Sequence, residues 1–269
     1  MDSSNKVQVV VATMHQNDFS KVNEMKINSD VIFANQSDET SYRQKEFDGF
    51  TARMISTETR GVGVNRNFGL QYADGDILLM ADDDMVYADN YTEIIKTAFK
   101  EIPDADAIIF NIETIGADMG RRTNSKISRV RIHNCLNYGA ARIAVRRNSL
   151  IRERISFSTC FGGGTIYSAG EDSLFICDML RKGFKIYTYP ATIASVDQTS
   201  STWFRGYNEK FIYDKGVFFG AAFKKTAPLM CLQYLLRHQK IHKDANLTVM
   251  QAFKLMIKGV KGYKLLKKW

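Results

Sequence analysis

The sequence has few residues of the kinds that interrupt or cross-link a chain. Its 269 residues include only three prolines, and no Ser/Gly-rich run marks a linker between halves. The four cysteines are scattered without CxxC spacing, which argues against a disulfide framework or a zinc site and favours the thiols of a reduced cytoplasmic protein. No apolar run reaches the length of a membrane span, and the first six residues are polar, so we expect neither a secretion signal nor a transmembrane anchor.

The positive charge of the chain is concentrated near its end. The formal net charge is +8, but residues 215–269 hold twelve Lys or Arg against one acid, Asp244, which leaves residues 1–214 slightly negative. This distribution favours an anionic surface as the partner of the C-terminal region and argues against nucleic acid as a partner of the main body. We therefore predict one large domain, 1–215, followed by a basic helical appendage, 216–269.

Apolar runs of strand length alternate with helical segments in the first half of the chain. Residues 7–13 and 31–34 are strongly apolar, residues 52–56 form a weaker run, and residues 18–28 suit a crossover helix. A further apolar run covers residues 77–81. This alternation predicts an α/β fold with a mostly parallel, Rossmann-like central sheet flanked by helices, and a ligand site at the carboxyl ends of the strands.

Three consecutive carboxylates follow the run 77–81, where a buried strand would reach solvent. Asp82, Asp83 and Asp84 repel one another at neutral pH unless a divalent cation or hydrogen-bond donors neutralise them. An acidic surface loop is the plain alternative for so short a pattern. Just upstream, residues 60–70 form a glycine-punctuated segment that opens a helix, with Arg66 near its amino terminus, where an anionic ligand would be favoured.

Four features in one order resemble the nucleotide-binding half of family 2 glycosyltransferases with the GT-A fold. They are Thr13 at the end of the first apolar run and the segments 35–40, 63–69 and 75–84. Together they are more specific than any one of them, and the resemblance extends over about residues 7–215. It implies a nucleotide-diphospho-sugar donor; the family has a small residue where this chain has Asn65.

The resemblance also assigns roles to individual side chains. It implies that Asp38 and Arg66 hold the nucleobase, and that Asp82 and Asp83 lie on the ribose side, with Thr13 as a further donor contact. It implies that Asp84 holds a divalent metal, Mn²⁺ or Mg²⁺, against the diphosphate.

A second cluster combines glycines with two acids. Three successive glycines let a ligand approach the backbone, and we expect Gly163 and Gly164 to contact the acceptor. Glu171 and Asp172 precede an apolar helix, 173–182, whose amino-terminal dipole favours an ionised carboxylate. A helix-capping acid is the plain alternative. The pair resembles the Glu-Asp motif of the same glycosyltransferases, and on that likeness we assign Asp172 as the catalytic base with Glu171 beside it.

Two more candidates lie further along the chain. Related enzymes often place a histidine near Asp197 as a metal ligand; this sequence has none there, so Asp197 is a candidate substitute. Trp203 is a candidate acceptor contact, although the aromatic residues around it are more often packing.

The basic appendage contains two expected helices. Residues 228–239 suit a helix with its leucines inward, namely Leu229, Leu232, Leu235 and Leu236. After Asp244, apolar residues recur at spacings of three and four with lysines off the stripe. This amphipathic helix could pack on the domain or lie on an anionic membrane, and its lysines favour the membrane. The stripe consists of Val249, Phe253, Met256, Val260 and Tyr263.

These features predict a cytoplasmic inverting glycosyltransferase, peripheral on the inner face of the cell membrane. The family resemblance implies that it moves a hexose from a UDP-sugar to a hydroxyl of a saccharide or lipid-linked saccharide in cell-surface polysaccharide synthesis. One alternative is a nucleotidyltransferase, but residues 14–18 lack the glycine and Lys/Arg of its phosphate loop. The other is a non-enzymatic membrane-peripheral binding module whose acids are structural.

Overall fold

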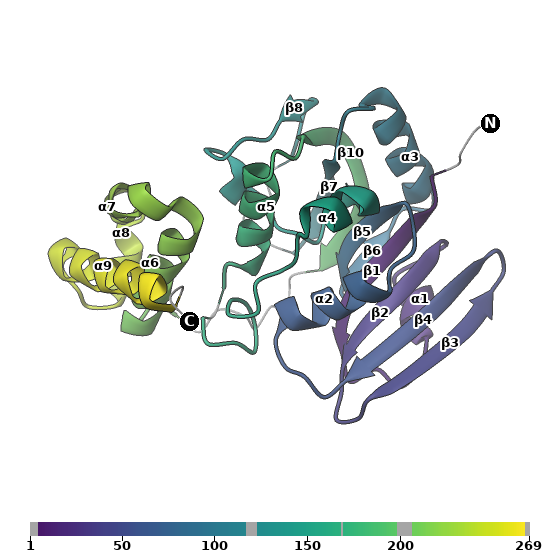
Figure 1. Cartoon of the computed structure of the whole chain (residues 1–269), viewed down its shortest axis with the longest axis horizontal. Coiled ribbons are helices and arrows are strands. Elements are labelled where there is room, and N and C mark those ends of the chain that lie inside the picture. The colour runs from purple at the N-terminus through teal and green to yellow at the C-terminus, as the bar shows by residue number, and fades with distance from the viewer. Residues whose placement is uncertain (1–4, 117–122, 168, 198–205, 267–269) are drawn as a thin grey trace. The chain divides into compact units, whose positions relative to one another are not determined.

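The structure of the chain, a computed structural model, describes residues 5–116, 123–167, 169–197 and 206–266 (Figure 1). Contacts divide the chain into two compact units. Unit 1 is Met1–Cys160 with Glu171–Ser200, and unit 2 is Phe161–Gly170 with Ser201–Trp269. Trp203 lies outside the described residues, so its acceptor contact stays a prediction. The division into residues 1–215 and 216–269, drawn from charge, also stays a prediction.

Unit 1 is built on one ten-stranded sheet with the strand order β3-β4-β2-β1-β5-β9-β7-β10-β6, and β8 pairs with β10. The strands are β1 Val7–Met14, β2 Asp30–Gln36, β3 Ser41–Phe47, β4 Phe50–Thr57, β5 Ile77–Asp82, β6 Met85–Tyr87, β7 Ala107–Ile115, β8 Ser128–Arg129, β9 Ile143–Arg146 and β10 Ile186–Asp197.

The parallel part of the sheet is the part that the apolar runs predict. β4, β2, β1 and β5 are parallel neighbours, so their carboxyl ends meet at one edge. Beyond them β9 is antiparallel to both β5 and β7, and β7 is parallel to β10. The predicted α/β fold with a central sheet flanked by helices is confirmed, and the sheet itself is mixed because β3, β6, β8 and β9 pair antiparallel.

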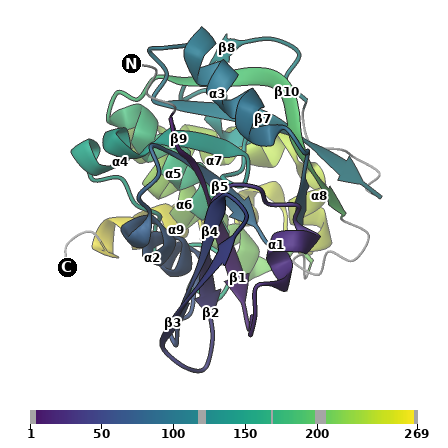
Figure 2. The same cartoon turned by 90° about the vertical axis from the view of Figure 1, so that its right-hand side faces the viewer.

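Helices cover both faces of the parallel strands, which explains why β1 and β2 are buried along almost their whole length. α1 (Ser20–Glu24) and α2 (Val62–Tyr72) lie on opposite sides of these strands (Figure 2). A Cβ on Gly69 of α2 would lie 2.6 Å from Val10 Cγ1, so this glycine permits the close approach of α2 to β1.

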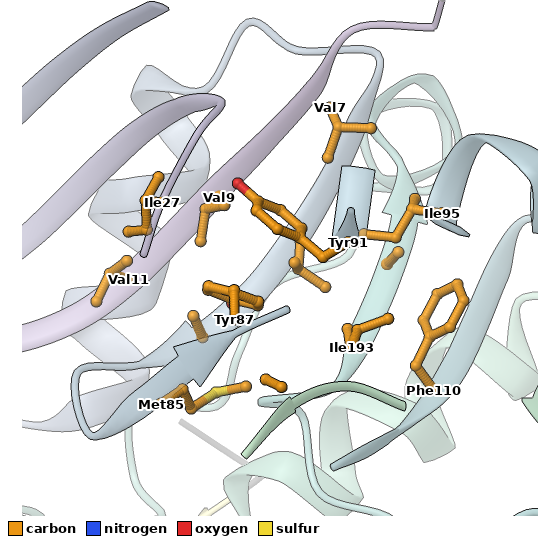
Figure 3. Close-up of a cluster of buried hydrophobic side chains, with 14 of the residues drawn as sticks. Val7, Val9, Val11, Ile27, Met85, Tyr87, Tyr91, Ile95, Phe110 and Ile193 are labelled. Carbon is orange, nitrogen blue, oxygen red and sulfur yellow. The ribbon is translucent and has the colours of Figure 1, made fainter. Parts of the chain in front are cut away.

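The other face of β1 supports a buried cluster around two tyrosines. Val9 and Val11 point into it, and Tyr87 and Tyr91 stack with ring centroids 4.5 Å apart (Figure 3). The Tyr91 hydroxyl shares a 2.7 Å hydrogen bond with Ser29 Oγ, which satisfies its polar atom within the core. Tyr91 begins α3 (Tyr91–Glu101), and the remaining helical elements of unit 1 are η1 Cys135–Asn137, α4 Arg147–Glu153 and α5 Glu171–Arg181.

Unit 2 contains the helices α6 (Glu209–Phe223), α7 (Ala227–Arg237), α8 (Gln239–Asp244) and α9 (Val249–Leu266), with η2 Lys224–Thr226 between the first two. α6 and α9 lie side by side (Figure 1) and touch through glycines. A Cβ on Gly216 would lie 2.1 Å from Met256 O, and one on Gly259 would lie 2.3 Å from Tyr213 O. These glycines, which would weaken an isolated helix, are required by the helix crossing.

The packing of α9 changes the interpretation of the appendage. Met256 and Val260, from the middle of the predicted membrane-facing stripe, are buried, and both lie against α6. The apolar face that we expected to lie on a membrane is therefore occupied within unit 2. No helix in the described ranges is both long and apolar enough to span a bilayer.

The orientation predicted for the four leucines of α7 is wrong for three of them. Leu235 is fully buried, whereas Leu229, Leu232 and Leu236 are 66%, 39% and 56% exposed. The buried side of α7 is instead formed by Ala227, Cys231 and Leu235, spaced four residues apart. Ala227 and Cys231 are small, so α7 can pack closely on this side, and Leu229, Leu232 and Leu236 face outward.

Candidate functional site

The candidate site lies where the parallel strands of unit 1 end, and Arg66 joins its parts. Arg66 is 3% exposed. Its Nη2 donates to Asp82 Oδ1 at 2.6 Å and its Nη1 donates to Asp172 Oδ1 at 2.5 Å, while Glu171 Oε1 lies 3.8 Å from Nη1. One buried cation therefore connects the end of β5 to the start of α5, two elements that are far apart in the sequence.

The electrostatics of Arg66 follow from these neighbours. Burial by itself lowers the pKa of its guanidinium, but the carboxylates of Asp172, Asp82 and Glu171 outweigh burial and raise that pKa above its usual value. The guanidinium stays charged at any pH at which the fold persists. Its Nε has no hydrogen-bond partner within the described part of the chain.

Neighbouring residues of α2 hold Arg66 in place. Asn65 Nδ2 donates to Thr13 O at 3.1 Å and Ala34 O at 2.6 Å, which fastens the helix to the ends of β1 and β2. Asn67 exchanges two hydrogen bonds with the backbone of Phe157, at 2.9 and 2.8 Å. Asn65, which departs from the family pattern, thus has a clear structural role that sequence reasoning missed.

Gly63 allows this part of α2 to approach the 157–158 backbone. A Cβ at Gly63 would lie 2.1 Å from Ser158 O. The Phe157 ring lies under the Arg66 guanidinium at 5.2 Å and stacks on Phe175 of α5 at 3.9 Å. The Phe157 ring, stacked on Phe175, therefore lines one side of the buried Arg66 guanidinium and makes a favourable cation–π contact with it.

The acidic triplet spans the turn between β5 and β6. Asp82 is the last residue of β5, and Asp83 and Asp84 form the turn. Asp83 Oδ2 accepts a 2.5 Å hydrogen bond from Thr13 Oγ1 at the end of β1. The predicted donor contacts Thr13, Asp82 and Asp83 are thus brought together with Arg66.

Asp38 lies at the outer rim of the same edge. Its side chain is 82% exposed and pairs with Arg60 at 2.6 Å. Arg60 also donates to the carbonyl oxygens of Ser37 and Glu58, at 2.7 and 3.0 Å. Arg60 is a second residue that sequence reasoning missed. Its only local signal in the sequence is that it is a basic residue directly before the glycine-punctuated segment.

Asp172 is held from two sides. One oxygen accepts from Arg66, and the other, Oδ2, accepts from the backbone N–H of Ala140 at 2.9 Å. A Cβ on Gly139 would approach the same oxygen to 3.2 Å. The two hydrogen bonds give the carboxylate a fixed orientation. Its side chain is 28% exposed, so the carboxylate also has access to solvent.

The two predicted metal ligands lie at the ends of two strands that pair with each other, Asp84 directly before β6 and Asp197 as the last residue of β10. β6 and β10 are antiparallel, with Val196 opposite Met85 at the end of the ladder. The next residues outward in that register are Asp84 and Asp197, and both are exposed. Carboxylate oxygens are the ligands that Mg²⁺ and Mn²⁺ prefer, so this donor pair fits such an ion completed by phosphate oxygens and water. The described residues contain no group of three His, Cys, Asp or Glu side chains suited to a metal.

Gly163 and Gly164 belong to unit 2. They lie in a turn in which Thr165 N and Oγ1 donate to Gly162 O at 3.2 and 2.9 Å. The turn is tied to α6, because Lys210 Nζ donates to Ile166 O at 2.9 Å and a Cβ on Gly170 would clash with the Phe218 ring. Their contact with an acceptor stays a prediction.

Comparisons with known proteins match the chain to a family model and to solved structures. Residues 22–163 match the family model described as Glycosyl transferase family 2. The fold is similar to the crystal structure of TarS residues 1–349 from S. aureus in complex with UDP-GlcNAc, with a TM-score of 0.61 and 16% identity over 87% of this chain and 73% of that chain.

Two further TarS structures from S. aureus agree. The complex of residues 1–349 with UDP has a TM-score of 0.59 and 16% identity over 87% of this chain and 72% of that one. The longer TarS structure has a TM-score of 0.60 and 14% identity over 87% of this chain and 43% of that one. A search of curated protein sequences finds no match.

Proposed function

The chain belongs to glycosyl transferase family 2 and has the GT-A fold expected from its sequence, and on this premise we propose that it transfers a sugar, with inversion, from a UDP-sugar to an acceptor hydroxyl. The observation that carries the proposal is the cluster at the carboxyl edge of the sheet, where Arg66 bonds both Asp82 and Asp172. A nucleotide donor is supported by the TarS complexes with UDP-GlcNAc and UDP.

In this proposal the edge formed by β1, β2 and β5 binds the nucleotide. Asp38 and Arg66 take the nucleobase, and Thr13, Asp82 and Asp83 take the ribose side. The Arg66 guanidinium has a second role in this proposal. Its hydrogen bonds to Asp82 and Asp172 fix the positions of these two carboxylates relative to each other. The exposed Arg60–Asp38 pair offers both a donor and an acceptor at the rim, which suits the polar edge of a base.

The diphosphate of the donor is negatively charged, so a cation is required for it to bind beside the acidic residues of the site. Asp84, directly before β6, and Asp197, the last residue of β10, would hold a Mn²⁺ or Mg²⁺ ion. Such an ion would offset the negative charge that develops on the departing diphosphate. The glycosyltransferase activity is thus proposed to depend on a divalent metal.

Asp172 is the proposed catalytic base. Its carboxylate takes the proton of the acceptor hydroxyl as that oxygen forms a bond to the anomeric carbon, and the bond from this carbon to the diphosphate breaks on the opposite face. The hydrogen bonds from Arg66 and the Ala140 N–H hold the carboxylate in one orientation, so little freedom is lost in the reaction. Glu171, 3.8 Å from Arg66 Nη1, adds to the charge balance of the cluster.

The acceptor that we propose is a hydroxyl group of a saccharide or lipid-linked saccharide in cell-surface polysaccharide synthesis. Its support is the family resemblance, together with the turn that contains the half-buried Gly163 and the exposed Gly164. Gly164 has φ +79°, a conformation that residues with a side chain rarely adopt.

The experiment is a panel of nucleotide sugars with Mn²⁺ or Mg²⁺, with release of UDP and transfer to added saccharides as readouts. Asp172→Asn should lower the transfer rate by about 10²- to 10⁴-fold and leave the affinity for UDP nearly unchanged. Asp178→Asn is the matched control, because Asp178 is on the same helix and pairs with Arg181 at its exposed end. Transfer by Asp172→Asn at the wild-type rate would remove Asp172 as the base. Pyrophosphate as the product would instead favour a nucleotidyltransferase.

A further inference from the structure

α7 presents an apolar face that nothing in the described residues covers. Leu229, Leu232 and Leu236 are 66%, 39% and 56% exposed and lie at spacings of three and four residues. At 3.6 residues per turn this spacing places all three on one side of the helix, opposite the buried Cys231 and Leu235. Three exposed leucines aligned on one helix are more than the isolated apolar residues found on any protein surface.

Basic side chains flank this face at both ends of the helix. Lys224 and Lys225 precede α7, and Arg237 and Lys240 follow at its carboxyl end, all four exposed. The only acid from residue 215 to the end of the described chain is Asp244. The apolar face of α7 is therefore framed by positive charge, with almost no negative charge to offset it.

This combination indicates the chemistry of the partner. A helix with leucines on one side and cations around them can insert the leucines at the boundary between acyl chains and headgroups, while the cations lie at the level of anionic headgroups. A protein partner would need a matching hydrophobic groove with an acidic rim, whereas an anionic bilayer supplies both features without further specificity. α9 does not offer such a face, because Met256 and Val260 are buried against α6.

We propose that unit 2 docks on anionic lipid membranes through the outer face of α7, formed by Leu229, Leu232 and Leu236 and flanked by Lys224, Lys225, Arg237 and Lys240. The docking depends on both parts. The cations bring the helix to the headgroups, and the leucines hold it there once charge alone is screened. This proposal rests on unit 2 only and is independent of the proposed sugar transfer.

The test uses the full-length chain and cosedimentation with vesicles of phosphatidylcholine, either pure or mixed with phosphatidylglycerol. We expect binding to the mixed vesicles only, and weaker binding as salt rises. The triple variant Leu229→Gln, Leu232→Gln, Leu236→Gln should bind at least about tenfold more weakly, because three apolar side chains no longer insert into the bilayer. These side chains are exposed, so the thermal unfolding of the variant should match that of the wild type.

Two matched controls separate this face from general charge and general stickiness. Ile151→Gln removes an exposed apolar side chain from α4 of unit 1, 56% exposed, and should bind as the wild type does. The second control compares two variants with the same loss of three charges. Replacing the lysines beside α7 should weaken binding by about fivefold for each cation, and more than replacing the exposed lysines of α9. These sets are Lys224, Lys225 and Lys240 against Lys254, Lys258 and Lys261.

Three results would overturn the proposal. The first is a full-length chain that ignores phosphatidylglycerol vesicles at low salt. The second is a triple leucine variant that binds as tightly as the wild type, which would mean attraction by net charge alone. The third is a wild type that is dimeric by light scattering and becomes monomeric in the leucine variant with no change in vesicle binding, which would make this face a contact between two copies of the chain.

Discussion

Replacing Arg66 by methionine removes a buried cation that three carboxylates share. Arg66 is 3% exposed and its two Nη atoms lie 2.6 and 2.5 Å from Asp82 and Asp172, with Glu171 at 3.8 Å. Breaking a buried pair by removing one partner costs about 3–5 kcal/mol. Asp82 and Asp172 are 39% and 28% exposed, so water can solvate them in the variant and the cost should be near 3 kcal/mol. The midpoint of thermal unfolding should fall by roughly 6–12 °C.

The variants Arg66→Met and Arg60→Met are compared with the wild type by thermal and by denaturant unfolding, each followed by circular dichroism. Arg60→Met is the matched control, since Arg60 and Asp38 are also 2.6 Å apart but have side chains 49% and 82% exposed. An exposed pair of this kind contributes about 0–1 kcal/mol, so this variant should remain close to the wild type.

A second substitution identifies the cause of the loss. Asp172→Asn in the Arg66→Met background should recover part of the lost stability, because it removes one of the repelling carboxylates, whereas the two changes would add if they acted separately. Equal losses for Arg66→Met and Arg60→Met would refute the reasoning, since they would show that burial of the Arg66 pair has no energetic consequence.

Three other changes have defined outcomes. Asp84→Asn should remove the enhancement by Mn²⁺ of UDP binding, measured by calorimetry, while Asp89→Asn, at a 92% exposed carboxylate, should retain it; equal enhancement in both would exclude Asp84. Gly63→Ala places a Cβ 2.1 Å from Ser158 O and should cost about 1–3 kcal/mol in denaturant unfolding, and an unchanged midpoint would show that the two segments separate without cost. Burial raises the pKa of Tyr91 from 10.0 to about 12, so the tyrosine ionises in the unfolded state first. The wild-type free energy of unfolding should therefore fall by roughly 2 kcal/mol more than that of Tyr91→Phe as the pH rises from 10 to 12; parallel pH profiles would contradict this.

The elements that the sequence predicts best are those in which local pattern and burial agree. β1, β2 and β5 are buried on both faces, so their apolar runs are continuous and their polar ends mark the site edge. β3 was missed because it is an edge strand with an exposed, polar sequence, paired on one side only. β9 was missed because it has four residues and pairs only with β5 and β7, which are distant in the sequence.

The sequence by itself determined the α/β class, the carboxyl edge at which Thr13 and Asp82 lie, and the amphipathic helices of the basic region, because each depends on a local run of residues. Only the tertiary structure decided that Arg66 bonds Asp172, 106 residues away, and that glycines pack α9 against α6 and thereby bury its stripe. It also decided that three leucines of α7 face outward. Periodicity shows that a helix has an apolar side, but which side is buried depends on the shape and size of the neighbours that pack against it.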